Sequence, residues 1–221
     1  MSSTEVGAGL AVDTPPGRVL LASNNAKKLA ELRRVVEAAG ITGLQVLGLG
    51  DVEAYPEPVE DGATFEENAL LKAREAVART GLPALADDSG LAVDALNGMP
   101  GVLSARWSGG KGDEANNDLL LAQLADVPAE RRGAAFVSVC ALVTPGGEDA
   151  TARGEWRGRI VVERRGAGGF GYDPLFVPDD DLAAGRTSAE LSAAEKDSLS
   201  HRGKALAKLV PVLRSLAAPD A

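Results

Sequence analysis

Two adjacent aspartates, Asp87 and Asp88, interrupt an apolar stretch in the segment ALADDSGL and are followed at once by Ser89 and Gly90. Neighbouring carboxylates repel each other and are seldom buried without partners, so a pair beside a core strand needs a chemical reason. On an extended backbone successive side chains point to opposite faces, which lets one carboxylate face a pocket while the other takes a structural partner. The segment alone leaves an acidic turn, a metal site and a catalytic acid–base pair open.

A second polar cluster, SNNAKK at residues 23–28, stands between the apolar run RVLLA and a segment whose apolar residues recur at helical spacing. A strand, a turn and a helix in this order direct backbone N–H groups and the positive end of a helix dipole toward an anion. Lys28 would add a positive charge at the same place. The competing interpretation is an ordinary helix cap followed by a solvated lysine pair.

Other motifs do not support the sites that they superficially match. GAGGFG at 166–171 has the form G-x-G-x-x-G, but YDP follows where a dinucleotide-binding motif opens its helix, and FGYDP by itself is typical of a turn. His201, the single histidine, has no nearby Ser–Asp pattern, so a hydrolytic triad is unsupported. Cys140, the single cysteine, lies in an apolar run and is predicted to be a core residue. Without a histidine–cysteine cluster, zinc is not expected.

The charge balance limits the classes of partner. The chain of 221 residues carries 23 Lys and Arg against 32 Asp and Glu, and its net charge of −9 argues against a sequence-independent nucleic-acid binder. A locally basic pocket for a small anion remains compatible with that total. The N-terminus lacks the basic start of a signal peptide, and no apolar run approaches the ~18 residues of a membrane span. We therefore expect no membrane association and a cytoplasmic location.

The elements that must position these residues predict an α/β fold with a mixed sheet. Small and polar residues ending in Pro-Pro-Gly predict a disordered extension over residues 1–17, followed by a single domain over 18–221. Capped apolar periodicity predicts helices at 26–39, 65–80, 113–125 and 192–216, the last with a kink or restart at Pro211.

Short apolar or alternating runs predict strands at 18–22, 82–86, 134–144, 150–158 and 159–165, with a further strand after the Gly-rich loop. Asp87 and Asp88 would then stand at the C-terminal end of the strand 82–86, and residues 91–96 could continue the sheet. Residues 97–112 are too rich in Gly and Pro to predict regular structure.

Taken in order, six motifs closely resemble those of the Ham1-type nucleoside-triphosphate pyrophosphatases: SNNAKK, TFEENALLKA, ADDSGL with GMPGVLSARWSG, GGFGYDPLF, AELSAAEK and LSHRGKAL. The motifs are long, and the resemblance covers residues 18–216. It implies an elongated mixed central sheet flanked by helices, with two lobes and the active-site cleft between them. It also implies Mg²⁺-dependent hydrolysis of ITP, dITP or XTP to the monophosphate and pyrophosphate, and a homodimer.

The resemblance assigns roles to the matching positions. The family's [ST]-x-N-x-x-K segment implies that one turn binds the triphosphate through Ser23, Asn24, Asn25, Ala26, Lys27 and Lys28. Asp88 is implied as metal ligand and proton acceptor, with Ser89 touching the substrate. The other implied substrate-binding residues are Phe170, Gly171, Tyr172, Asp173, Lys196, His201 and Arg202.

One loop departs from the family pattern. Many relatives carry two acidic residues before the Thr-Gly that precedes the second helix, whereas this chain has Val59-Glu60 before Asp61-Gly62. Glu60 is therefore a candidate for the metal ligand expected from this loop, but its position does not match a motif.

The chemistry of the candidate residues agrees with this resemblance. Cleavage at an α-phosphate requires neutralised charge, an activated water and a stabilised leaving group. Lys28 beside a helix N-terminus, and Mg²⁺ held by oxygen ligands such as Asp88, meet these needs without a covalent nucleophile. In the base, O6 of hypoxanthine or xanthine accepts a hydrogen bond where adenine presents an amino donor. Arg202 is the predicted donor to O6, with His201 beside it, and Phe170 or Tyr172 would stack on the ring.

Two other functions remain open on the sequence. One is a related hydrolase that acts on modified pyrimidine or ordinary nucleoside triphosphates. The other is a nucleotide-binding regulator without turnover. The presence of both Lys28 and Asp88 argues against this second function.

Overall fold

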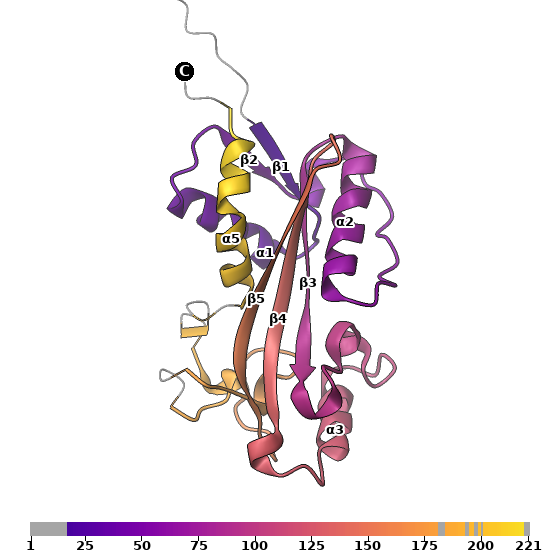
Figure 1. Ribbon diagram of the computed structural model, residues 1–221, viewed down its shortest axis with the longest axis vertical. Helices are drawn as coiled ribbons and strands as arrows, with labels where there is room; N and C mark the ends of the chain where they lie inside the picture. Colours follow the sequence, from indigo (N-terminus) through magenta and orange to yellow (C-terminus); the bar gives the residue numbers. More distant parts are fainter. Residues whose placement is uncertain (1–16, 181–183, 193–194, 197–198, 200, 219–221) are drawn as a thin grey trace, which may run out of the picture.

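A mixed β-sheet runs through the computed structural model, which describes residues 17–180, 184–192, 195–196, 199 and 201–218 (Figure 1). Its strands are Gly17–Leu21 (β1), Leu44–Leu47 (β2), Ala84–Val93 (β3), Gly133–Val143 (β4), Asp149–Ile160 (β5) and Phe176–Pro178 (β6). They lie in the order β2-β1-β3-β4-β5-β6. β1 pairs in parallel with β2 and β3, whereas β3, β4, β5 and β6 pair antiparallel in turn. The α/β class with a mixed sheet is thus confirmed.

Helices cover both faces of the sheet. They are Ala26–Ala38 (α1), Phe65–Thr80 (α2), Asp113–Gln123 (α3) and His201–Ser215 (α5). α1 and α5 pack on one face and α2 on the opposite face, while α3 lies toward the far end of the long strands (Figure 1). Leu85 of β3 joins the core cluster under α1 and α5, and its neighbour Ala86 joins the cluster under α2. Consecutive residues of β3 therefore face different helices.

The helix ends follow from local sequence. Asn25 caps α1, since its side-chain oxygen accepts hydrogen bonds from two main-chain N–H groups of the first turn at 2.9 and 3.4 Å. Thr64 caps α2 through one such bond of 3.1 Å, and Gly81 ends that helix in the left-handed region at φ +67°. The three helices predicted in the first 130 residues are confirmed, the third ending at Gln123.

The long strand β3 corrects one prediction. Asp87 and Asp88 lie in the middle of its ten residues, whereas the sequence predicts that they end a strand. β4 pairs with β3 at all ten positions, so distant partners continue the ladder through the polar ADDSG segment. β1 pairs with β3 as far as Leu85, which places the two aspartates just beyond the end of the parallel pairing.

Two further segments differ from the predictions because they contact strands that are distant in the sequence. β5 unites the strand predicted at 150–158 with the start of the one predicted at 159–165, because Asp149 to Arg159 pair continuously with β4. The segment Gly101–Arg106, predicted to be irregular, forms 3₁₀ turns packed beside β3. The strand after the Gly-rich loop is confirmed as β6.

The predictions for the chain ends fall partly outside the described residues. Gly17, expected in the N-terminal extension, is the first residue of β1, and residues 1–16 lie outside the description. α5 runs through Pro211 as one helix without a restart. Of the helix predicted at 192–216, residues 193–194, 197–198 and 200 are not described. Within the described ranges, the helices are too short or too polar to cross a membrane.

Candidate active site

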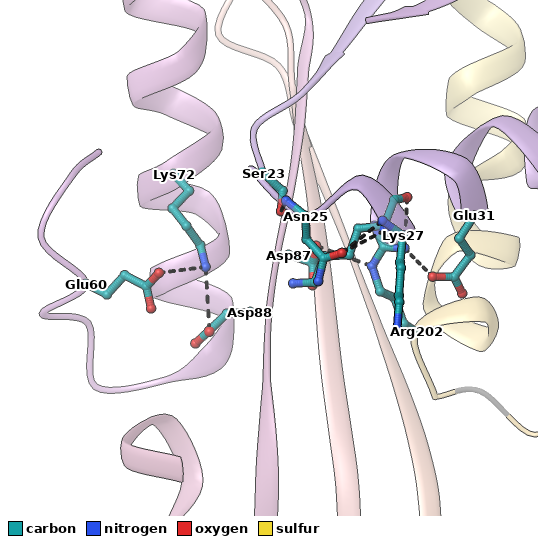
Figure 2. Close-up of polar contacts among 10 residues, drawn as sticks. Ser23, Asn25, Lys27, Glu31, Glu60, Lys72, Asp87, Asp88 and Arg202 are labelled. Atoms are coloured by element: carbon teal, nitrogen blue, oxygen red, sulfur yellow. Dashed lines mark hydrogen bonds and ion pairs between the residues drawn. The ribbon is translucent and has the colours of Figure 1, made fainter. Parts of the chain in front are cut away.

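Asp87 and Asp88 point to opposite faces of β3, as predicted for neighbours on a strand (Figure 2). Asp87 faces α1 and α5, where its Oδ2 accepts a hydrogen bond from Lys28 Nζ at 2.6 Å and its Oδ1 lies 3.3 Å from Arg202 Nε. Burial alone would raise the pKa of Asp87, but the Lys28 ammonium and the Arg202 guanidinium hold it below its ordinary value. Asp87 is therefore an ionised, buried partner for two cations.

Arg202 connects three elements beneath the 23–28 turn. Its guanidinium bonds the carboxylate of Glu31 on α1 and donates to the main-chain oxygen of Lys28 at 3.4 Å. The residue is buried, and these contacts place its charged group on the side of β3 that Asp87 occupies. Arg202 thus supports the position of Lys28 and of the first turn of α1.

Asp88 faces α2, whose Asn68 and Lys72 lie one turn apart. Asn68 Nδ2 donates to Asp88 Oδ2 at 3.1 Å, and Lys72 Nζ lies 3.6 Å from Asp88 Oδ1. Burial raises the pKa of Asp88, and the Lys72 ammonium and the Asn68 hydrogen bond offset only part of that shift. The carboxylate is consequently a better proton acceptor than an exposed aspartate.

The carboxylates of Asp88 and Glu60 converge on a single positive charge, the ammonium of Lys72, which donates to Glu60 Oε1 at 3.0 Å (Figure 2). Two carboxylates that converge on one position form a set of hard oxygen donors, and such a set suits Mg²⁺. Among the residues described, no group of three or more His, Cys, Asp and Glu side chains could hold a metal ion. The donor set therefore fits Mg²⁺ held by one or two carboxylates, with its other ligands from phosphate and water.

A cavity of about 500 Å³ opens beside Glu60 and Lys72. The first half of the 23–28 turn lines it, together with the loop before α2 and Lys72; the polar lining residues include Ser23, Asn24, Asn25, Glu53, Tyr55, Glu57 and Glu60. Asn24 donates a hydrogen bond to Glu57 between these two walls. Ala26 and Lys27 are exposed in the first turn of α1, and Lys28 extends toward Asp87.

A second cavity, of about 200 Å³, lies farther along β3 and is more apolar. Its wall combines rings with a few polar groups, among them Ser89, Asp113, Phe136, Trp156, Phe170, Gly171, Tyr172, Asp173, Lys196 and His201. Most of the residues expected to bind the nucleoside are thus brought together here. Such a slot has the size and lining to hold a flat heterocycle.

Asp173 organises one wall of the second cavity. It is buried, and its carboxylate bonds Lys196 and accepts hydrogen bonds from the N–H of Phe170 at 2.9 Å and from Ser188 Oγ at 2.8 Å. The ring of Phe170 is 79% exposed, with Lys196 Nζ 5.2 Å from its centroid. Tyr172 is buried instead, and its hydroxyl donates to a main-chain oxygen at 2.9 Å.

His201 forms part of the same cavity as a neutral ring. It stacks on Phe136, with centroids 5.7 Å apart and planes at 18°. Burial, assisted by the Lys196 ammonium, lowers the pKa of His201 to about 4. Nδ1 is buried and has no hydrogen-bond partner in the described part of the chain. The imidazole therefore remains available to a ligand without carrying charge at neutral pH.

Two residues without a predicted role, Asn68 and Lys72, contact Asp88 directly. They lie at i and i+4 on α2, and the neighbouring buried positions of that helix are mostly alanines. A polar pair at helical spacing on a face of small residues is the signal that could have identified them.

Comparison with known proteins places these motifs in a family. The model of the Ham1 family matches residues 19–212. The chain is 63% identical over 204 residues to a dITP/XTP pyrophosphatase of Corynebacterium efficiens, which covers 90% of this chain and 99% of the relative. It is 66% identical over 201 residues to a dITP/XTP pyrophosphatase of Nocardia farcinica, covering 90% and 96%.

Solved structures share the fold. The nucleoside-triphosphatase / dITP/XTP pyrophosphatase of Mycobacterium abscessus matches with 61% identity and a TM-score of 0.76, over 89% of this chain and 99% of that one. A HAM1 protein from Coxiella burnetii matches with 40% identity and a TM-score of 0.80, over 90% and 98%. With sequence, motif order and fold matched over most of its length, the chain belongs to the Ham1 family.

Proposed function

We propose that this protein hydrolyses dITP, ITP and XTP to the nucleoside monophosphate and pyrophosphate in a Mg²⁺-dependent reaction that clears them from the nucleotide pool. Its relatives from C. efficiens and N. farcinica are dITP/XTP pyrophosphatases. The observation that carries the proposal is that two consecutive residues of β3 connect with the two cavities, one through a contact with a lining side chain and the other as a lining residue. Asp88 contacts Lys72 in the wall of the larger cavity, and Ser89 lines the smaller one. A nucleotide that spans both cavities would have its α-phosphate beside Asp88.

Asp88 is the proposed proton acceptor. It takes a proton from the water that attacks the α-phosphorus, while the bond from that phosphorus to the bridging oxygen breaks and pyrophosphate leaves. Its raised pKa favours this role, and the Asn68 hydrogen bond fixes the orientation of the carboxylate. When bound by Asp88 and Glu60, Mg²⁺ would supply neutralisation of the phosphate charge.

The triphosphate is proposed to lie along the 23–28 turn and Lys72. The N-terminal end of α1 provides a positive dipole, and Lys28 is held beside it by the buried carboxylate of Asp87. Because Arg202 holds the same carboxylate, its contacts favour support of the phosphate site over the predicted donation to the base. Ser23, Asn24, Asn25, Ala26 and Lys27 complete the proposed phosphate site.

The nucleoside is proposed to occupy the smaller cavity. Phe170 can stack on the base there, and Lys196 and His201 present polar nitrogens to the same cavity. Gly171 and Asp173 shape the same wall, and Tyr172 fills the core behind it. Ser89 lies between the nucleoside and the α-phosphate.

On this proposal, residues from Gly17 onward form one domain with two lobes, and the substrate lies in the cleft between them. The separate linings of the two cavities, which share no residue, support that arrangement. We further propose a homodimer, which light scattering after size-exclusion chromatography would test. A role in the nucleotide pool favours the cytoplasm.

Hydrolysis of dITP in ¹⁸O-labelled water tests the reaction directly. Attack at the α-phosphorus places one labelled oxygen in dIMP and none in pyrophosphate, as mass spectrometry of the products would show. Label in pyrophosphate or in free phosphate would contradict the proposed point of cleavage. Tight nucleotide binding without any product would favour a regulator instead.

A further inference from the structure

Two side chains of α3 hold one glycine of the cavity wall from both sides. The N–H of Gly171 donates to Asp113 Oδ2 at 2.6 Å, and the carbonyl oxygen of Gly171 accepts from Asn117 Nδ2 at 2.9 Å. Asp113 and Asn117 lie at i and i+4, so both face the same way from the first turns of α3. Together they fix the peptide groups on each side of Gly171.

The two residues differ in exposure, which separates their contributions to folding. Asn117 is buried, with 3% of its surface exposed, and its amide also donates to the main-chain oxygen of Asp113 at 2.9 Å. Asp113 is exposed and lines the smaller cavity. A change at Asp113 can therefore release Gly171 without removing a core residue.

The orientation of Phe170 depends on this backbone. Its ring is 79% exposed, so side-chain packing gives it little support. The preceding peptide is held by Asp173, which accepts the N–H of Phe170 at 2.9 Å, and the following one by Asp113. Gly171 adopts φ +60°, a conformation that glycine tolerates and that nearby hydrogen bonds must select.

We propose that Asp113 and Asn117 are positioning residues for base recognition: by fixing the backbone of Gly171 they orient Phe170 at the cavity and set the affinity for the base, while the phosphates bind elsewhere. This inference rests on the proposed function, because it takes the smaller cavity to hold the base of the nucleotide. Neither residue belongs to the motifs that suggested the substrate site.

The closing experiment separates base binding from phosphate binding in the metal-free protein. Dissociation constants for dIMP and for inorganic tripolyphosphate would be measured by calorimetry on the wild type, Asp113→Ala, Asp113→Asn and Asp118→Ala. Asp118 is the matched control, since it is also an α3 carboxylate, bonded to Arg164 at 2.6 Å and away from Gly171. Thermal melting establishes that each variant is folded at the assay temperature.

Asp113→Ala should weaken dIMP binding by about 10-fold or more, the effect of losing a hydrogen bond to a charged group, and leave tripolyphosphate binding within about 2-fold. Asp113→Asn retains an oxygen acceptor and should recover most of the dIMP affinity. Asp118→Ala should bind both ligands as the wild type does. In turnover, the ratio of kcat/KM for dITP to that for dATP should shrink in Asp113→Ala alone.

Unchanged dIMP affinity in Asp113→Ala would overturn the inference and leave Asp113 as a helix-terminal acid. An equal loss for dIMP and tripolyphosphate would also overturn it, because it would show a general structural defect. As a second variant, Asn117→Ala must show the same selective loss of dIMP binding at a temperature where it is folded. A wild-type protein that binds no dIMP and cleaves no dITP would instead refute the proposed function, and the inference with it.

Discussion

At the scale of single residues, two neighbouring carboxylates differ in what surrounds them. Asp87 is enclosed by Lys28 and Arg202 and has a lowered pKa, whereas Asp88 meets Asn68 and Lys72 and has a raised one. The alternation of side chains along β3 produces this division. One aspartate stabilises the proposed phosphate-binding turn, and the other faces the proposed reacting group.

Replacement of Asp88 by Asn keeps its shape and removes both the charge and the proton acceptor. We expect kcat for dITP to fall by about 10²-fold or more, the lower range for a lost general base, with little change in thermal stability. Asp87→Asn should mainly lower the stability, because it removes the charge that faces the buried Arg202 and the partly buried Lys28. Near-full activity of Asp88→Asn in Mg²⁺ would refute the assignment.

His201 should be neutral throughout the physiological range. Its folded pKa of about 4 lies below the ordinary value of 6.5, so its contribution to stability is fully present above pH 6.5 and is lost as the pH falls toward 4. As the chain has a single histidine, NMR titration of the imidazole reads this pKa without assignment. A value at or above 6.5 in the folded protein would contradict the buried environment.

At the scale of elements, local signals predicted what local interactions determine. Asn25 and Thr64 predict where α1 and α2 begin, because a capping side chain accepts hydrogen bonds from N–H groups within three residues of itself. The opposed directions of Asp87 and Asp88 followed from strand geometry in the same way. The helix signals and family motifs therefore sufficed for these features.

Partners distant in the chain determine what the sequence did not predict. β3 continues past the aspartates because β4, which begins 40 residues after β3 ends, pairs along its full length. The contact of Arg202 with Glu31 joins residues 171 positions apart and draws the guanidinium toward α1. Residue spacing within a segment carries no information on such contacts. The sequence alone therefore could not test the prediction that Arg202 donates to the base.

The Arg202 contacts also make a stability prediction. Arg202→Ala removes one of the two cations that face the buried Asp87 carboxylate and also leaves Glu31 without that ion pair. We expect the free energy of unfolding to fall by about 3–5 kcal/mol, measured by urea denaturation. Arg153→Ala, which breaks the exposed pair with Glu155, should cost about 0–1 kcal/mol. Equal effects of the two changes would show that Arg202 does not tie α5 to β3.

At the scale of the whole molecule, the proposed phosphate site lies in an acidic protein. The net charge of −9 disfavours polyanions in general, whereas Lys72 and the residues at the N-terminal end of α1 line one cavity together with Glu53, Glu57 and Glu60. The adjoining apolar cavity along β3 adds a place for a base. On the proposed function, the two cavities together would hold the phosphates and the base of one nucleoside triphosphate.

The most direct test of the account is kcat/KM for dITP, XTP, dATP and dGTP in Mg²⁺, with pyrophosphate followed as the product. We expect kcat/KM for dITP and XTP to exceed that for dATP and dGTP by about 10²-fold or more. A site that donates hydrogen bonds to O6 leaves its donor groups unpaired when adenine binds. The same site must exclude guanine separately, through its 2-amino group. Comparable values for all four nucleotides, or release of single phosphates in place of pyrophosphate, would contradict it.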